Sequence, residues 1–148
     1  ARDALQRELL PLATLLTPNL HEAGLLTGRA IRTVPEMEEA ARELLRTGCG
    51  AVVVKGGHLG DESVTDVYCD ANGIHHLRGE FVPTSNTHGT GCTFSSALAA
   101  NLAQGLAPRE AASRGKAYIG AALAASSSLG HGHGPVNHFP GDWIRHRE

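Results

Sequence analysis

Aromatic residues are scarce in this chain of 148 residues, since Phe, Trp and Tyr together make up only 4%. Glycine and alanine are frequent instead, so we expect helices with small side chains that pack closely together. Hydrophobic residues reach 41% and charged residues 19%, which predicts a folded chain and excludes an intrinsically disordered one. The length fits one domain with a real hydrophobic core, and no repeat or linker divides residues 1–148.

A strong excess of one charge is also absent. The formal net charge of −2 argues against a general electrostatic grip on nucleic acid or on an anionic membrane, although it permits a local anion site. No apolar run reaches the roughly 18 residues of a membrane span, and no signal-peptide pattern opens the chain. We therefore expect neither nucleic acid nor membrane among the partners.

Cysteines are few and far apart. The three residues Cys49, Cys69 and Cys92 form no C-x-x-C pair, so the sequence indicates neither a disulfide scaffold nor a zinc knuckle. A reducing cytosol is the natural compartment for such a chain, so we expect a cytoplasmic protein.

Apolar patterning predicts an α/β fold. Thr14 to Thr17 reads as a short strand, and the unbroken apolar run from Ala51 to Val54 reads as a strand covered on both faces. A helix from about Pro35 to Thr47 separates them, with a capping box at its start. Strand, helix and strand at this spacing indicate a mostly parallel sheet. Val64 to Cys69 and Ile74 to Arg78 then predict a hairpin at the sheet edge.

Three more helices complete the expected elements. The first is short and is ended by Pro11, and the other two are rich in alanine and follow each other; the ranges are Asp3 to Leu10, Cys92 to Gln104 and Pro108 to Ser128. Gly130 to Pro140 is expected to be a loop. Its His-Gly alternation, from His131 to His138, is poor geometry for a metal site because no Cys or acidic partner accompanies it.

The sharpest motif is Asn86-Thr87-His88-Gly89-Thr90-Gly91-Cys92-Thr93, which runs directly into a predicted helix. Glycines allow a tight turn and a close approach of ligand to backbone, and a helix start offers unpaired N–H groups and a positive dipole end. Gly89, Thr90 and Gly91 therefore form a candidate phosphate site. The alternative is an ordinary Gly-rich turn with a Thr or Ser cap, and short glycine motifs recur by chance.

Cys92 stands at the start of that helix, where a thiol can act as a thiolate base or nucleophile. The alternative is a small buried core thiol, which is the more frequent role of a lone cysteine. Cys49 and Cys69 lack this setting, and we assign them to packing. A cysteine hydrolase is disfavoured because no neighbouring motif supplies a base and an orienting residue.

Two further sets of polar residues follow the predicted strands. Asn19 and Glu22 could hold a hydrated Mg²⁺ near a phosphate, but without other information we interpret them as a helix N-cap and its capping-box partner. Lys55 leaves the C-terminal end of the buried strand, where open α/β sheets bind their ligands. It could reach nucleotide phosphates, or be a solvated lysine beside a flexible turn.

Four segments in order resemble the hydroxymethylpyrimidine/phosphomethylpyrimidine kinase family of the ribokinase superfamily. They are L-L-P-L-A-T-L-L-T-P-N-L-H-E-A (Leu9 to Ala23), V-V-V-K-G-G-H (Val52 to His58), N-T-H-G-T-G-C-T (Asn86 to Thr93) and G-H-G-H-G-P-V-N-H-F (Gly130 to Phe139). Most of the superfamily has aspartate where Cys92 stands, and cysteine there is typical of this branch and of some pyridoxal kinases.

The resemblance implies a fold, a reaction and roles. The fold is a ribokinase-like three-layer sandwich, and ATP with Mg²⁺ phosphorylates 4-amino-5-hydroxymethyl-2-methylpyrimidine and then its monophosphate in thiamine biosynthesis. Cys92 would be the base, Gly89 to Cys92 the anion hole and Lys55 an ATP contact. Asn19 and Glu22 would organise Mg²⁺. The resemblance also implies a homodimer for the full-length protein.

One departure from the family matters. The family's N-terminal half, with its G-x-D-x-S-G-G-A-G-x-Q-A-D segment and most pyrimidine contacts, has no counterpart here, so we expect 1–148 to be the C-terminal part of a single kinase domain and to be inactive alone. Two alternatives stay open. One is a pyridoxal-type vitamin kinase with the same Gly-Thr-Gly-Cys loop, and the other is a non-catalytic nucleotide-binding fragment that needs a second chain.

Overall fold

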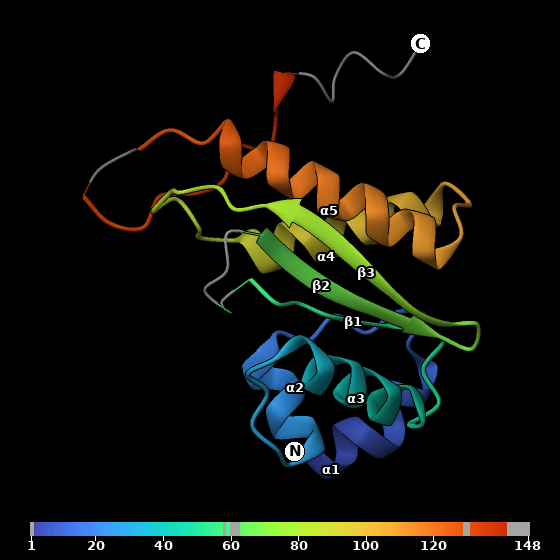
Figure 1. Ribbon diagram of the computed structural model, residues 1–148. Helices are drawn as coiled ribbons and strands as arrows, with labels where there is room; N and C mark the ends of the chain where they lie inside the picture. Colours follow the sequence, from blue (N-terminus) through green and yellow to red (C-terminus); the bar gives the residue numbers. More distant parts are fainter. Residues whose placement is uncertain (1, 58, 60–62, 129–130, 142–148) are drawn as a thin grey trace. The chain divides into compact units, whose positions relative to one another are not determined.

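The computed structural model describes residues 2–57, 59, 63–128 and 131–141 (Figure 1). The chain divides into two compact units, Ala1–Arg78 and Gly79–Glu148, and each is described by itself. The predicted α/β character is confirmed, because helices and strands both occur among the described residues. None of the described helices combines the length and apolar character that a membrane crossing needs.

The first unit holds most of the regular elements. In chain order these are α1 (Arg2–Ala4), the π-helical η1 (Leu5–Leu9), the 3₁₀-helical η2 (Leu10–Leu12), α2 (Leu20–Thr27), α3 (Val34–Leu45), β1 (Val52–Val54), β2 (Ser63–Asp70) and β3 (Gly73–Glu80), whose last two residues belong to the second unit. The first helix was expected to be a single α-helix. Instead Leu10 N–H bonds to Leu5 O in the π-helical pattern, and Pro11, which has no N–H, lies in the 3₁₀ turn that follows.

The described sheet has the order β1-β2-β3. β1 pairs antiparallel with β2, with Val52 opposite Cys69 and Val54 opposite Val67, and the two-residue connection between β2 and β3 confirms the predicted hairpin. The expectation of a mostly parallel sheet does not match this three-stranded arrangement.

Among the residues that the structure describes, parallel pairing is confined to isolated bridges. Leu16 pairs with Val52 and Asn19 with Lys55, through bonds such as Val53 N–H to Leu16 O (2.7 Å) and Lys55 N–H to Pro18 O (2.9 Å). The segment expected as a strand thus runs beside β1 without forming a full ladder. Pro18 contributes to this because it cannot donate a ladder hydrogen bond.

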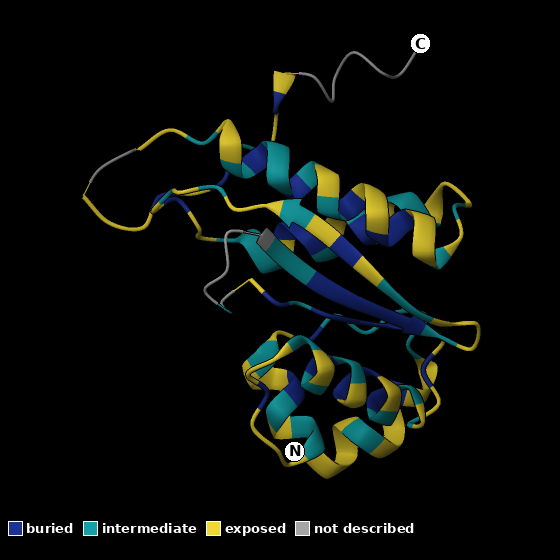
Figure 2. Ribbon diagram, in the orientation of Figure 1, coloured by how far each residue is buried: buried dark blue, intermediate teal, exposed yellow. Residues whose placement is uncertain are grey.

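The core of the first unit forms between α3 and the sheet. The predicted apolar stripe of α3 buries Met37, Ala40, Ala41 and Leu44, and these side chains pack with buried residues of β1 and β2, namely Val52, Val54, Val67 and Cys69. Figure 2 shows β1 and much of β2 as buried. The hydrophobic run that predicted β1 is therefore the run that the sheet encloses.

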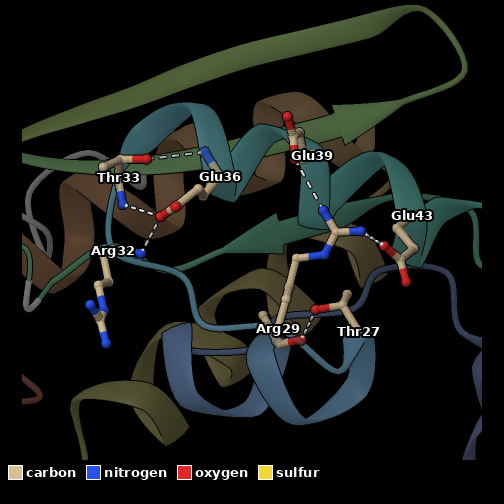
Figure 3. Close-up of polar contacts among 8 residues, drawn as sticks. Thr27, Arg29, Arg32, Thr33, Glu36, Glu39 and Glu43 are labelled. Atoms are coloured by element: carbon tan, nitrogen blue, oxygen red, sulfur yellow. Dashed lines mark hydrogen bonds and ion pairs between the residues drawn. The ribbon is translucent and has the colours of Figure 1, made fainter.

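The start of α3 has the predicted capping box. Glu36 N–H donates to Thr33 Oγ1, and the Glu36 carboxylate accepts from the backbone N–H of Thr33 (Figure 3). Arg29, just beyond the C-terminus of α2, forms exposed ion pairs with Glu39 and Glu43 of α3. Exposed pairs of this kind contribute about 0–1 kcal/mol each, so the apolar stripe holds α3 in place.

The second unit is built on two helices, α4 (Thr90–Ala103) and α5 (Pro108–Ala124). They pack closely because α5 presents small residues. A methyl group at Gly115 would lie 3.4 Å from both Leu98 Cγ and Phe94 Cε2 of α4, and Ala111, Ala112 and Ala122 are fully buried. The expectation of small, closely packed helix faces is thereby confirmed.

Candidate phosphate-binding site

The loop from Asn86 enters α4 through a glycine in the left-handed conformation. Gly89 has φ 81°, and no side chain caps the helix at this residue. Thr90 instead turns its hydroxyl back to Thr87 O at 2.7 Å. The Thr90 N–H also donates to Thr87 O, at 3.3 Å. The first turn of α4 therefore offers the N–H groups after Thr90, which no side chain of the N-cap residue occupies, at the positive end of a fourteen-residue helix.

The two glycines of the motif, Gly89 and Gly91, contribute to the loop in different ways. Gly89 needs the conformational freedom of glycine, because its positive φ disfavours other residues. Gly91 lies inside α4 and does not have a positive φ, so its contribution is the absence of a side chain near the helix start. The special backbone geometry of the motif is thus located at Gly89.

Cys92 is the exposed cysteine of the three. Cys49 and Cys69 are buried in the first unit, and burial raises the pKa of both thiols, which agrees with their predicted packing role. The alternative of a buried core thiol at Cys92 is wrong. Cys92 is the third residue of α4, next to Gly91, and it is exposed there.

The first unit brings Asn19, Glu22 and Lys55 together. Asn19 is the N-cap of α2 and exchanges two hydrogen bonds with Glu22, each of 2.8 Å, so the capping-box interpretation is confirmed. The parallel bridge between Asn19 and Lys55 places the end of β1 beside this cap.

The oxygen chemistry of the cap fits a hydrated Mg²⁺. Both Asn19 and Glu22 are exposed, and Mg²⁺ favours one or two carboxylates together with waters and phosphate oxygens. Within the described ranges no group of three or more His, Cys, Asp or Glu side chains could hold a metal ion.

A buried aspartate supports the turn that follows Lys55. Gly56 N–H donates to Asp66 Oδ1 at 2.9 Å, and Asp66 is only 4% exposed. A methyl group at Gly56 would overlap Thr65 O, so β2 and the turn touch directly. Sequence reasoning missed Asp66, whose signal was an acidic residue between the apolar residues Val64 and Val67 of the predicted strand. His58, from the same motif, lies outside the described residues.

The Gly/His/Pro segment braces the loop before α4. His88 N–H bonds to Gly134 O at 3.2 Å, His88 and Pro135 form a parallel bridge, and His133 Nδ1 lies 3.2 Å from Ser85 O. The ordered loop expected here is confirmed for 131–140. Sequence reasoning did not connect it with the candidate phosphate loop, because 48 residues separate Asn86 from Gly134.

A family model and the similar proteins of known name agree on one family. A family model described as phosphomethylpyrimidine kinase matches residues 1–137. The hydroxymethylpyrimidine/phosphomethylpyrimidine kinase of Rhizobium meliloti (strain 1021) is 50% identical over 143 residues, which are 95% of this chain and 54% of that protein. The thiamine biosynthesis bifunctional protein ThiED of Geobacter sulfurreducens is 49% identical over 94% of this chain and 28% of its own.

Solved structures extend the comparison to a related vitamin kinase. An ADP complex of Bacillus subtilis pyridoxal kinase has a TM-score of 0.90 and 41% identity, and the match covers 94% of this chain and 53% of that one. The chain thus spans about half the length of the curated single-function relative and of this structure.

Proposed function

Since the chain belongs to the phosphomethylpyrimidine kinase family, we propose that it carries the phosphate-handling part of an ATP-dependent kinase. The acceptors are 4-amino-5-hydroxymethyl-2-methylpyrimidine and its monophosphate, in the synthesis of thiamine diphosphate. The relative named for thiamine biosynthesis supports this pathway.

The observation that carries the proposal is the uncapped start of α4 with an exposed thiol beside it. In the first phosphorylation the acceptor hydroxyl oxygen attacks the γ-phosphorus of ATP, the bond to the β-phosphate oxygen breaks, and ADP leaves. In the second, an oxygen of the monophosphate is the attacking atom, and ADP leaves in the same way. Backbone N–H groups from Gly89 to Cys92 stabilise the charge on the transferred group. Cys92 accepts the hydroxyl proton in the first phosphorylation.

The first unit supplies groups suited to the nucleotide. Lys55 is half-buried at the end of β1 and donates to ATP phosphate oxygens. Asn19 and Glu22 hold Mg²⁺ through waters, and the ion, when bound, neutralises phosphate charge. Phosphoryl transfer depends mainly on positioning and charge neutralisation, and the ADP complex of the pyridoxal kinase relative supports ATP as donor.

Assembly and compartment belong to the same proposal. Residues 1–148 form the C-terminal part of one ribokinase-like, three-layer kinase domain, which acts as a cytoplasmic homodimer at full length. The half-length match to the relatives supports the first point.

The direct test is an assay of ATP-dependent phosphorylation with the protein at the full length of its relatives. ADP release and product mass are followed with the pyrimidine alcohol, with its monophosphate and with pyridoxal. The proposal expects the addition of one phosphate to the alcohol and of a second to the monophosphate. Absence of both products, in a folded preparation that binds ATP, overturns it.

A pyridoxal-type kinase is the second candidate, because the pyridoxal kinase relative is 41% identical with a TM-score of 0.90. The same assay separates the two. A kcat/KM for pyridoxal above that for the pyrimidine alcohol would favour the second candidate.

A further inference from the structure

Asn86 lies in the loop that leads into α4, and its side chain is enclosed. The residue is 3% exposed, although asparagine is mostly a surface residue. Its backbone N–H donates to Thr84 Oγ1 (3.1 Å), and its side-chain amide donates to Ser126 Oγ (3.4 Å), just beyond the C-terminus of α5. A buried polar side chain thus anchors the loop three residues before Gly89.

The hydroxyl groups around Asn86 fix the orientation of its amide. Ser126 donates its only hydroxyl proton to Leu123 O at 2.6 Å, so its oxygen accepts hydrogen bonds from its other neighbours. Thr84 Oγ1, 3.3 Å from Ser126 Oγ, is then the donor of that pair. The nitrogen of the Asn86 amide faces Ser126 for the same reason, and its oxygen faces away.

The oxygen of this amide is buried against a glycine. Asn86 Oδ1 has no hydrogen-bond partner among the residues that the structure describes, and a buried unpaired acceptor costs about 1–3 kcal/mol. A methyl group at Gly134 would overlap Oδ1 and lie 2.9 Å from Asn86 Cγ. Gly134 does not have a positive φ, so glycine is needed here for space and not for backbone conformation.

Gly134 also holds the backbone next to the phosphate loop, because its carbonyl accepts from His88 N–H at 3.2 Å. The segment that carries Gly134 is fixed to α5 in turn. Asn137 N–H bonds to Ala122 O at 3.0 Å and its amide to Ala125 O at 3.2 Å. A continuous set of contacts therefore leads from α5 through Gly134 to the two residues on either side of Thr87.

We infer that Asn86 and Gly134 form a positioning pair that fixes the path of the loop into α4, and with it the N–H groups from Gly89 to Cys92. The inference rests on the proposed function, because those N–H groups must bind the transferred phosphoryl group. Asn86 is enclosed, so it acts through the loop and not on the substrate. A displacement of about 1 Å in such a site can cost on the order of 10²-fold in rate.

The first test compares Asn86→Ala with Asn101→Ala in the full-length protein. Asn101 is a matched control, since its amide also donates one bond, to Ala97 O at 2.8 Å, near the opposite end of α4. Steady-state kcat, KM for ATP and Tm are measured for both. We expect Asn86→Ala to lower kcat at least tenfold with KM for ATP within about threefold, and Asn101→Ala to keep kcat within about twofold.

A second variant changes Gly134, the other residue of the positioning pair. Gly134→Ala forces the Asn86 side chain to move without deleting it, and should lower both Tm and kcat. In the double variant Asn86→Ala/Gly134→Ala the nearest remaining atom of residue 86 is Cβ, at 3.5 Å from the new methyl group. We expect the double variant to recover Tm relative to Gly134→Ala while kcat stays low.

Recovery of Tm without recovery of kcat separates positioning from structural support. A wild-type kcat in folded Asn86→Ala, or a kcat that follows Tm across all the variants, overturns the positioning pair and leaves the proposed function intact. A wild-type protein that phosphorylates none of the tested alcohols overturns the proposed function together with the inference that rests on it.

Discussion

The buried carboxylate of Asp66 in β2 accepts a hydrogen bond of 2.9 Å from the backbone N–H of Gly56, the residue after Lys55. Asp66→Ala removes this acceptor and leaves a buried N–H group without it. We expect a loss of about 1–3 kcal/mol in the free energy of unfolding, measured by urea denaturation, and weaker ATP binding because the turn after Lys55 loses its support. Asp66→Asn keeps an acceptor oxygen and should be milder. Equal losses in the two variants would contradict this account.

The two glycines after Lys55 provide a matched pair for steric tests. A methyl group at Gly56 would overlap Thr65 O and lie 2.9 Å from Met37 Cε, whereas one at Gly57 would meet only Val64 Cγ1, at 4.0 Å. Gly56→Ala should therefore cost about 1–3 kcal/mol, as overpacking typically does, and Gly57→Ala should be close to neutral. Thermal unfolding of the two proteins measures the difference, and an equal Tm would show that the turn relaxes freely.

Local sequence patterns correctly predicted the structural elements that depend on interactions between residues close in the sequence. The run from Ala51 to Val54 became β1, and the Thr33–Glu36 spacing became a capping box. What failed depends on contacts between distant segments. The mostly parallel sheet was predicted wrongly, because the patterning of a strand does not reveal the direction of its neighbour. Asp66, which supports the turn after Lys55, and Gly134, which contacts the loop before α4, meet partners 10 and 48 residues away.

The motif before α4 makes a prediction about its two glycines. Gly89→Ala places a side chain at φ 81°, where the new methyl group would meet Thr93 Oγ1 in ordinary contact at 4.0 Å, so backbone strain should dominate and cost about 1–2 kcal/mol. Gly91→Val should retain the fold better and reduce phosphate binding, because the valine side chain occupies the approach to the helix start. ATP affinity and Tm, measured for both variants, distinguish these effects.

Thr87→Ala is the control for the backbone account, since it keeps every N–H group of the loop. We expect it to be milder than Gly91→Val in ATP affinity and turnover. Wild-type ATP affinity and turnover in Gly91→Val, together with their loss in Thr87→Ala, would mean that side chains make the phosphate contacts. Lys55 would then be the first residue to test.

Acid should weaken the fold through Asp70 at the end of β2. Burial acts to raise the pKa of this carboxyl group, but hydrogen bonds from Asn72 N–H (2.8 Å) and the Tyr68 hydroxyl (2.9 Å) outweigh it, so the pKa lies below its ordinary value of 3.8. A carboxyl group whose pKa is lower in the folded state than in the unfolded state stabilises the fold at pH values above its unfolded-state pKa. This stability is lost as the pH falls through the folded-state pKa. The gap in unfolding free energy between wild type and Asp70→Asn should therefore be widest near about pH 7 and shrink toward about pH 3. Tyr68→Phe removes one of the hydrogen bonds, so its difference in unfolding free energy from the wild type should be smaller than that of Asp70→Asn. A difference between wild type and Asp70→Asn that is constant with pH would contradict the assignment.

Cys92 offers the sharpest test of the proposed chemistry. It is exposed, whereas Cys49 and Cys69 are buried with raised pKa values, so brief treatment of the folded protein with iodoacetamide should modify Cys92 first, as peptide mass analysis would detect. ATP present during the treatment should slow this modification if the start of α4 binds phosphate.

Cys92→Ser should lower kcat by about 10²–10⁴-fold with ATP affinity nearly unchanged, since a serine hydroxyl is a poor base near neutral pH. Cys49→Ser is the matched control and should affect Tm more than kcat, because that thiol is enclosed in the core. A Cys92→Ser protein with the wild-type kcat would remove the thiol from the reaction, and the backbone N–H groups of α4 would remain as the catalytic contribution of this segment.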